Sequence, residues 1–196
     1  MQQLYYNENN FPVIDLGDYV LREQISDDVE DFFAYYADPE VSKYVISDIP
    51  KTLEEAKYEL KYWIDVFKNN DGIYFAIARK DNNKLIGTIG LNGINRIHNR
   101  IELSYDLAKE YWNKGITTQA IKAVTWYGFE KMRINRIEAY SLEQNVASRK
   151  VLTKCGFFLE GELRQHRYYN GVYKDIGIFS LVYDEYVGNA SNLIDK

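Results

Sequence analysis

A strictly alternating segment in the middle of the chain constrains the fold more than any other feature. Within residues 97–107, apolar or aromatic side chains alternate with polar ones from residue 100 onwards: Ile101, Leu103, Tyr105 and Leu107 are separated by Glu102, Ser104 and Asp106. A period of two is that of a β-strand with one face in a core and the other lined by polar groups. The fold must therefore contain a sheet that presents these polar groups on one face.

The segments around this strand predict a mixed α/β fold. We expect further strands over residues 19–25, 73–79, 84–93, 136–142, 157–169 and 172–183, and helices over residues 27–37, 52–68, 116–132 and 145–155. Thr52 followed by Glu55 is a capping box, and Asn170-Gly171 is a type I′ turn signal between the last two strands. Elements in this order pack as a mixed sheet covered by helices.

Length and charge limit the classes of protein. A chain of 196 residues can form one core, so we expect a single domain over 19–185, an N-terminal arm at 1–18 and a C-terminal tail at 186–196. A formal net charge of -5 argues against general nucleic-acid binding. The first residues have neither a basic start nor an apolar run, and no apolar stretch approaches about 20 residues. We therefore expect a cytoplasmic protein that does not enter a membrane.

Cysteine and histidine are too sparse for a metal site or a disulfide framework. The chain has one cysteine, Cys155, and two histidines, His98 and His166, with no spacing typical of metal ligands. Cys155 stands beside a helix end and is expected to be structural, and His98 is expected in a turn. We therefore expect no metal.

The segment from Tyr105 to Ala120, YDLAKEYWNKGITTQA, predicts the end of a strand, a turn at Gly115 and the start of a helix. The start of a helix offers unpaired backbone N–H groups and a partial positive charge, which suit a pyrophosphate. A turn that only connects two elements explains the same residues, so this segment alone leaves both interpretations open.

This segment resembles motif A of the GNAT acetyltransferases, R/Q-x-x-G-x-G/A. Gly115 matches the central glycine, whereas Trp112 stands at the Arg/Gln position and Thr117 at the final Gly/Ala position. Residues 112–120 fit a variant, W-G/N-K-G-I/Y-x-T-E/Q-A, that is similar to the RimJ/RimL branch, the N-terminal acetyltransferases of ribosomal proteins.

A second segment resembles motif B of the same family, N-x-x-A/S-x-x-L/V-x-x-x-x-G-F. It is matched by Asn145, Ser148, Val151, Gly156 and Phe157. Helix capping explains Asn145 and Gly156 individually. It does not explain why this helix follows a strand that itself follows the Gly115 helix, about thirty residues earlier. The two motifs in this order are far more specific than either alone.

The resemblance implies the GNAT fold, a mostly antiparallel central sheet splayed in its middle with helices on both faces, and acetyl-CoA as cosubstrate. The residues expected to contact acetyl-CoA are Leu107, Ala108, Trp112, Asn113, Lys114, Gly115, Ile116, Thr117, Thr118, Asn145, Ser148 and Lys150. In this scheme the backbone N–H groups of residues 113–118 hold the pyrophosphate, and those near Leu107 and Ala108 polarise the acetyl carbonyl.

The resemblance also raises a question about the leaving thiolate. Many GNAT enzymes protonate it with a tyrosine four residues before the motif B glycine, where this chain has Leu152. Ser148 is then the expected catalytic contact to the sulfur. Tyr168 or Tyr169 of the last hairpin is an open alternative.

Glu102 is the expected catalytic base, because a carboxylate can take the proton that an attacking amine must lose. The alternative is that Glu102 is a solvated strand residue. Acidic and phenolic groups suit a cationic acceptor, so Tyr35, Tyr44 and Tyr168 are expected to contact it, although partly exposed surface tyrosines would look the same.

The resemblance implies transfer of an acetyl group from acetyl-CoA to a primary amine, by direct attack in a ternary complex. A protein N-terminal α-amine is the first expected acceptor. Acetylation of a small amine, such as a polyamine or an aminoglycoside, is the alternative within the same chemistry. An acyl-CoA-binding module without catalysis is the alternative of another class. A homodimer stays open.

Overall fold

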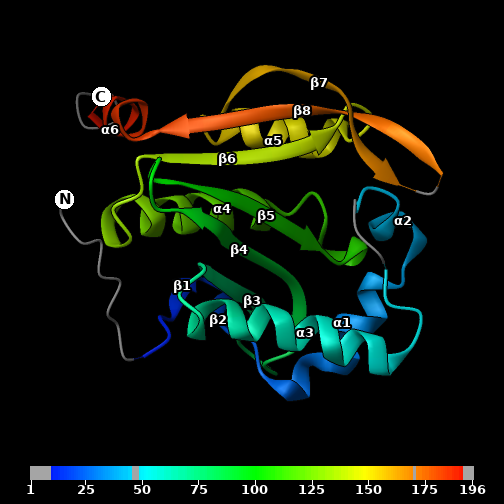
Figure 1. The fold of residues 1–196 in the computed structure, drawn as a ribbon. Helices are drawn as coiled ribbons and strands as arrows, with labels where there is room; N and C mark the ends of the chain where they lie inside the picture. The colour runs from blue at the N-terminus through cyan, green and yellow to red at the C-terminus, as the bar shows by residue number, and fades with distance from the viewer. Residues whose placement is uncertain (1–9, 46–48, 170, 192–196) are drawn as a thin grey trace.

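The computed structural model describes residues 10–45, 49–169 and 171–191. Within them, one sheet has the strand order β1-β2-β3-β4-β5-β6-β8-β7. The strands are β1 Ile14–Leu16, β2 Tyr19–Glu23, β3 Ile73–Arg79, β4 Leu85–Asn95, β5 Arg100–Leu107, β6 Arg136–Leu142, β7 Phe158–Tyr169 and β8 Val172–Val182. The helices are α1 Val29–Tyr36, α2 Pro39–Ser42, α3 Leu53–Lys68, α4 Ile116–Trp126, α5 Val146–Lys154 and α6 Tyr183–Ser191. Figure 1 shows α1 and α3 in front of the sheet and α4 and α5 behind it.

The sheet splays between β5 and β6, as expected for the fold. These neighbours are the parallel pair, and they are in register only over three positions, from Arg100 opposite Arg136 to Glu102 opposite Glu138. Beyond Glu102, β5 continues along β4 as far as Leu107, while β6 continues along β8. Figure 1 shows the two strands diverging towards their C-terminal ends. The second half of β5 therefore faces a gap, with its backbone groups unpaired by β6.

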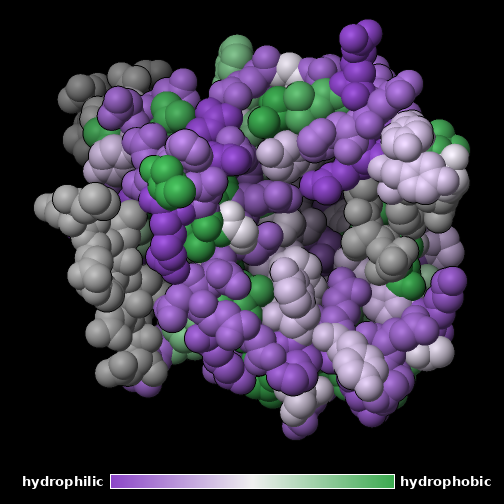
Figure 2. Space-filling model, viewed as in Figure 1, coloured by the Kyte–Doolittle hydropathy of each residue, from purple (hydrophilic) through white to green (hydrophobic). Residues whose placement is uncertain are grey.

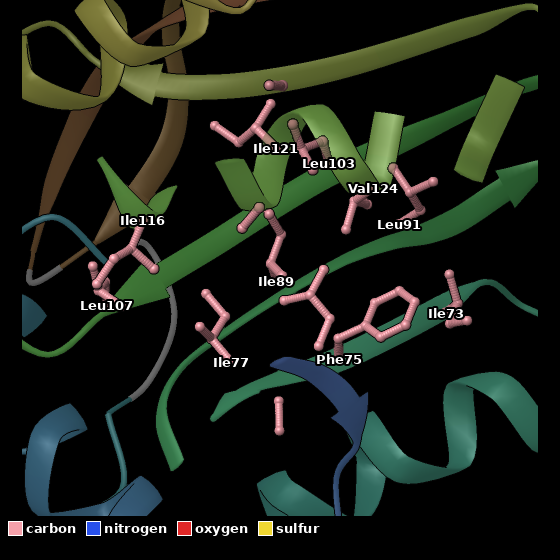
Figure 3. Packing of buried hydrophobic residues seen from close by; sticks show 14 of the residues in the cluster. Ile73, Phe75, Ile77, Ile89, Leu91, Leu103, Leu107, Ile116, Ile121 and Val124 are labelled. Atoms are coloured by element: carbon pink, nitrogen blue, oxygen red, sulfur yellow. The ribbon is translucent and has the colours of Figure 1, made fainter. Parts of the chain in front are cut away.

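The buried face of β5 fixes the position of α4. Ile121 and Val124 of α4 are fully buried and lie in one layer with Leu91 of β4 and Leu103 of β5 (Figure 3). Ile116, the first residue of α4, belongs to the same core. Burial of each such side chain contributes roughly 1.5–3 kcal/mol. Packing along its whole length therefore holds the start of α4 at the gap.

Three short elements differ from the sequence expectations. Pro39 begins an additional helix, α2, which Asp38 caps; proline suits the first helical position because its missing N–H would have no partner there. Part of the expected arm is β1, which pairs with β2. Part of the expected tail is α6, where Tyr186 stacks on Phe129 of the core at 4.8 Å between ring centroids. Residues 1–9 and 192–196 lie outside the described residues.

The helix expected over 116–132 changes its hydrogen bonding near its end. It is α-helical to Trp126 and continues as a π-helical turn over Tyr127–Lys131. A Cβ at Gly128, within that turn, would approach Leu91 and Ile137 closely. The wider turn thus lets the backbone lie directly on the sheet. No helix in the described part of the chain is both long and apolar enough to cross a membrane.

Gly90 of β4 shapes the face of the sheet under α3. The ring of Tyr74 lies over Gly90, stacks on Trp63 of α3 at 4.1 Å between centroids, and carries its hydroxyl to within 3.0 Å of Ser104 Oγ. A Cβ at Gly90 would overlap both this ring and the backbone of β3. The absent side chain therefore permits the contact between β3 and the polar face of β5.

We expect Gly90→Ala to lower the free energy of unfolding by about 2 kcal/mol, because forced overpacking of a core has a typical cost of 1–3 kcal/mol. Urea unfolding followed by fluorescence measures this change. Gly161→Ala is the matched control, since a Cβ there meets no atom within 4 Å. A Gly90→Ala protein as stable as Gly161→Ala would contradict this packing.

Candidate active site

The turn before α4 presents unpaired N–H groups. Asn113 and Gly115 both have left-handed backbone conformations, with φ of 61° and 78°. The first helical hydrogen bond runs from Gln119 N to Gly115 O at 3.1 Å, so the N–H groups of Ile116, Thr117 and Thr118 have no partner inside the helix. Open space surrounds the Gly115 Cα. These features fit a bound diphosphate.

Trp112 and Lys114 shape this turn in different ways. The Trp112 indole N–H donates to Leu107 O at 2.7 Å, which ties the turn to the end of β5. The Lys114 ammonium lies 5.0 Å from the centroid of the Tyr111 ring and adds a positive charge beside the turn. Trp112 thus positions the turn through its side chain, and direct contact between Trp112 and a cosubstrate stays a prediction.

The expected role of Ala108 as a donor to the acetyl carbonyl is wrong. Its N–H donates to Ile86 O of β4 at 2.8 Å, so it is already used by the sheet. Because N–H groups alternate sides along a strand, the N–H of Leu107 points away from β4, into the gap. The N–H of Leu107 is therefore not used by β4, and its contact with the acetyl carbonyl stays a prediction.

The first turn of α5 closes the other side of the gap. Asn145 Oδ1 accepts a hydrogen bond from Ser148 N at 3.1 Å and so caps the helix. The Ser148 hydroxyl lies 2.8 Å from the hydroxyl of Tyr105 of β5. Leu152, at the usual position of the catalytic tyrosine, is 1% exposed. The structure thus brings Ser148 to the gap together with a phenol from another element.

Sequence reasoning missed Tyr105 because its position in the alternating strand assigned it to the core. A signal was present: a tyrosine among buried aliphatic residues carries a hydroxyl that needs a partner. What the sequence could not show is that this partner is Ser148, which lies 43 positions along the chain.

Lys150 and Cys155 occupy different parts of α5. Lys150 is exposed and lines a surface pocket of about 510 Å³ together with Arg149 and Lys154, so its contact with acetyl-CoA stays a prediction. Cys155 is half-buried, its Sγ lies 3.8 Å from Thr118 O, and burial raises the pKa of its thiol. A thiol that stays protonated supports the structural role expected for Cys155.

Glu102 lies where the parallel pairing ends, opposite Glu138 of β6. Burial raises the pKa of the Glu102 carboxyl, the Arg167 guanidinium lowers it and the Glu138 carboxylate raises it, with a net upward shift. Glu138 is ion-paired with Arg100 and Arg136, whereas Glu102 makes no side-chain hydrogen bond within the described residues. A carboxylate with a raised pKa and no fixed partner suits a general base.

The other polar residues of this face are held by neighbours. Asp106 accepts hydrogen bonds from the Tyr35 hydroxyl at 2.5 Å and from the N–H and hydroxyl of Thr88 at 3.1 and 2.9 Å. Ser104 contacts the Tyr74 hydroxyl and Asn92, each at 3.0 Å. Glu102 is therefore the carboxylate of β5 that remains available to a substrate.

A model of the family described as "Acetyltransferase (GNAT) domain" matches residues 19–158. The chain belongs to the GNAT acetyltransferase family. The "Uncharacterized N-acetyltransferase YoaA" of Bacillus subtilis (strain 168) is 33% identical over 172 residues, which are 88% of this chain and 97% of that protein. This chain is therefore an acetyl-CoA-dependent N-acetyltransferase of the GNAT type.

Solved GNAT structures share the fold. The ribosomal-protein-S5-alanine acetyltransferase of Vibrio fischeri has a TM-score of 0.79 and 27% identity, over 88% of this chain and 97% of that one. The spermidine N-acetyltransferase of Vibrio cholerae, solved with CoA and spermine, has a TM-score of 0.76 and 21% identity, over 87% and 98%. At that identity the second structure shows the fold alone.

The tyrosines expected at the acceptor of this GNAT enzyme lie in different environments. Tyr35 is buried and its hydroxyl is bonded to Asp106, which makes it a structural support in this structure. Tyr44 lies under the Lys43 ammonium, 4.8 Å from its ring centroid. Tyr168 is 65% exposed and pairs with Tyr173 at 4.9 Å between centroids. Acceptor contacts by these residues stay predictions, and the side chain of Tyr169 lies outside the described residues.

The two histidines of this GNAT chain lie in a turn and in a strand. His98 is exposed in the turn after β4, and its N–H donates to Asn95 Oδ1 at 3.0 Å. His166 of β7 stacks with Tyr140 at 6.1 Å between ring centroids. In the part of the chain that the structure describes, no group of three or more His, Cys, Asp or Glu side chains is placed to hold a metal ion.

We expect Asp106→Asn to change the pH dependence of stability. Burial raises the pKa of Asp106 from 3.8 to about 6 despite the bonds from Tyr35 and Thr88. The folded protein therefore keeps this proton to a higher pH than the unfolded chain, so the stability it contributes is complete below pH 3.8 and is lost as pH rises through about 6. That loss is about 3 kcal/mol, and Asp106→Asn lacks it.

Urea unfolding of both proteins at pH 4 and pH 7 measures the difference. The stability of the natural protein relative to Asp106→Asn should be greater at pH 4 than at pH 7. The same difference between the two proteins at both pH values would show that Asp106 titrates normally.

Proposed function

We propose that this enzyme acetylates the α-amine at a protein N-terminus by direct attack on acetyl-CoA. The observation that carries the proposal is the position of Glu102 at the base of the gap, on the face opposite α4 and α5. The unpaired N–H groups at the start of α4 support binding of the cosubstrate on one face of the sheet. The position of Glu102 supports binding of the acceptor on the other face of the sheet.

The α1 and α3 face offers room for that acceptor. Figure 2 shows this face hollowed near its centre, with hydrophilic side chains around much of the hollow. The polar groups of β5 belong to this face, because Ser104 and Asp106 are bonded by Tyr74 of β3 and Tyr35 of α1.

The acceptor nitrogen loses its protons on this face: an ammonium loses one before it attacks, and the nitrogen loses another after the bond to carbon forms. The neutral amine nitrogen bonds to the carbonyl carbon of the thioester, the carbon–sulfur bond breaks, and CoA leaves as the thiolate. The proton lost by the nitrogen passes to the Glu102 carboxylate, directly or through water, and then to solvent. The N–H of Leu107 can bond the carbonyl oxygen as negative charge develops on it.

The charges near Glu102 favour a peptide over a polyamine. The Arg167 guanidinium lies close enough to lower the pKa of Glu102, and Arg100 pairs with Glu138 beside it. A polyamine brings several positive charges, which the Arg167 guanidinium repels. A peptide brings one positive amine followed by carbonyl oxygens, which guanidinium groups can bond. The similarity to the Vibrio fischeri ribosomal-protein acetyltransferase supports the same acceptor class.

Release of CoA in the presence of acetyl-CoA and single acceptors tests this function. The panel contains short peptides with free N-termini, the same peptides with blocked N-termini, spermidine and an aminoglycoside. We expect CoA release with free peptides and none with blocked ones, and mass spectrometry should place the acetyl group on the α-nitrogen. Turnover of spermidine alone would instead select the small-amine function, and no release with any acceptor would leave an acyl-CoA-binding module.

Glu102→Gln should lower kcat by at least about 10²-fold, within the 10²–10⁴ range typical of general bases, and most strongly at low pH. At low pH the amine arrives protonated and must lose a proton to the base before it attacks as well as the one it loses afterwards, whereas at high pH it arrives neutral and loses only the second. Initial rates from pH 6 to pH 9 with the active peptide measure the profile. Glu23→Gln on β2 is the control, because it removes a strand carboxylate from a strand that β3 and β4 separate from β5. A parallel profile for Glu102→Gln and the natural protein would remove Glu102 from the mechanism.

A further inference from the structure

The departure of CoA leaves negative charge on sulfur, and the usual phenol of the fold is missing. Leu152 fills that position and is buried in the core. Within the described residues, the hydroxyl groups that α5 and β5 bring together at the gap are those of Ser148 and Tyr105. A serine hydroxyl on its own can turn in several directions, so its hydrogen is free to point away from a ligand.

Tyr105 restricts that freedom. Its hydroxyl lies 2.8 Å from Ser148 Oγ and 3.5 Å from Ser148 O, so the side-chain oxygen is the better acceptor by distance. Burial raises the pKa of Tyr105 well above its ordinary value, and its phenol therefore keeps its proton near neutral pH. The backbone of Ser148 is fixed as well, since its N–H donates to Asn145 Oδ1.

We propose that Tyr105 is the positioning residue for the leaving thiolate. Its hydroxyl donates to Ser148 Oγ, which occupies one lone pair of that oxygen and turns the serine proton into the gap, towards the sulfur of CoA. The serine then stabilises the thiolate by a hydrogen bond, and neither hydroxyl gives up its proton. The phenol missing from α5 is thus replaced by one from β5 that acts through Ser148. This role rests on the acetyl transfer proposed above.

The surroundings of the pair suit this role. Cys155 is the titratable group that influences the Tyr105 phenol from α5, and it is itself kept protonated by burial. The Lys122 and Lys154 ammonium groups lower the pKa of the Cys155 thiol, but burial has the larger effect and raises it. Tyr105 points to the α4 and α5 side, whereas Ser104 and Asp106, its neighbours along β5, are bonded on the other face. The hydrogen bond between Tyr105 and Ser148 therefore sits where the pantetheine arm is expected.

A thiol titration tests the proposal without any acceptor. The protein is saturated with CoA carrying carbon-13 next to sulfur, and its chemical shift is followed against pH in the natural protein, Tyr105→Phe, Ser148→Ala and the double variant. A hydrogen bond to sulfur lowers the thiol pKa. We expect that pKa to rise in Tyr105→Phe and to rise further in Ser148→Ala, with the double variant equal to Ser148→Ala, because Tyr105 acts through the serine.

Rates with the active peptide give the second readout. Tyr105→Phe should lower kcat three- to tenfold with an unchanged KM for the peptide. Tyr111→Phe is the matched control: it removes a buried phenol hydroxyl that bonds Arg79 at 3.4 Å, and both readouts should stay at their natural values.

The two proposals fail differently. If the thiol pKa of Tyr105→Phe equals that of the natural protein, or if the effects of Tyr105→Phe and Ser148→Ala add in the double variant, the role of Tyr105 is overturned whatever the turnover. If the thiol pKa shifts as expected but no acceptor is acetylated, the proposed acetyl transfer fails and the contact of Ser148 with sulfur stands.

Discussion

The loss of pairing between β5 and β6 after Glu102 determines the rest of the site. Three paired positions hold the strands together, and the natural twist and divergence of β5 and β6 then open a gap lined by backbone groups. Backbone N–H and C=O groups in such a gap need partners, and an extended ligand with amides can supply them. The first turns of α4 and α5 lie on one side of this opening, and Glu102 lies on the other at its base.

The two faces of β5 carry different functional groups. On the α4 and α5 face, the alternating residues are buried apart from Tyr105, whose hydroxyl reaches Ser148 across the gap. On the opposite face, Asp106 and Ser104 are bonded by residues of α1 and β3, which stiffens the strand close to Glu102. The one carboxylate of this strand without a fixed hydrogen bond, among the described residues, is therefore held on a rigid support, as a general base requires.

The sequence predicts those features of the site that depend on residues close together in the chain. The alternation of β5, the glycine turn before α4 and the cap of α5 by Asn145 are set by neighbours in the chain, and the structure has all three. The order of the two motifs then indicated the splayed sheet. Residues whose role depends on distant partners could not be predicted in this way. The N–H of Ala108, for example, donates a hydrogen bond to Ile86 O because of the register between β4 and β5.

Hydrogen bonds between side chains that are far apart in the chain could not be predicted from the sequence either. Tyr35 and Asp106 are 71 positions apart, and only the packing of α1 on the sheet brings their hydrogen bond about. The alternating pattern places Tyr105 in the core, because periodicity indicates which face a side chain is on and not what its polar end contacts. The short helix α2 and the strand β1 fall below the length at which a pattern is informative.

Binding of the cosubstrate depends most on the main-chain N–H groups at the start of α4, which we propose hold the diphosphate of CoA. Isothermal titration of the protein with CoA and with pantetheine, which carries the same thiol arm without the diphosphate, measures that claim directly. We expect CoA to bind at least a hundredfold more tightly than pantetheine. Equal affinities, or no heat with CoA, would contradict it.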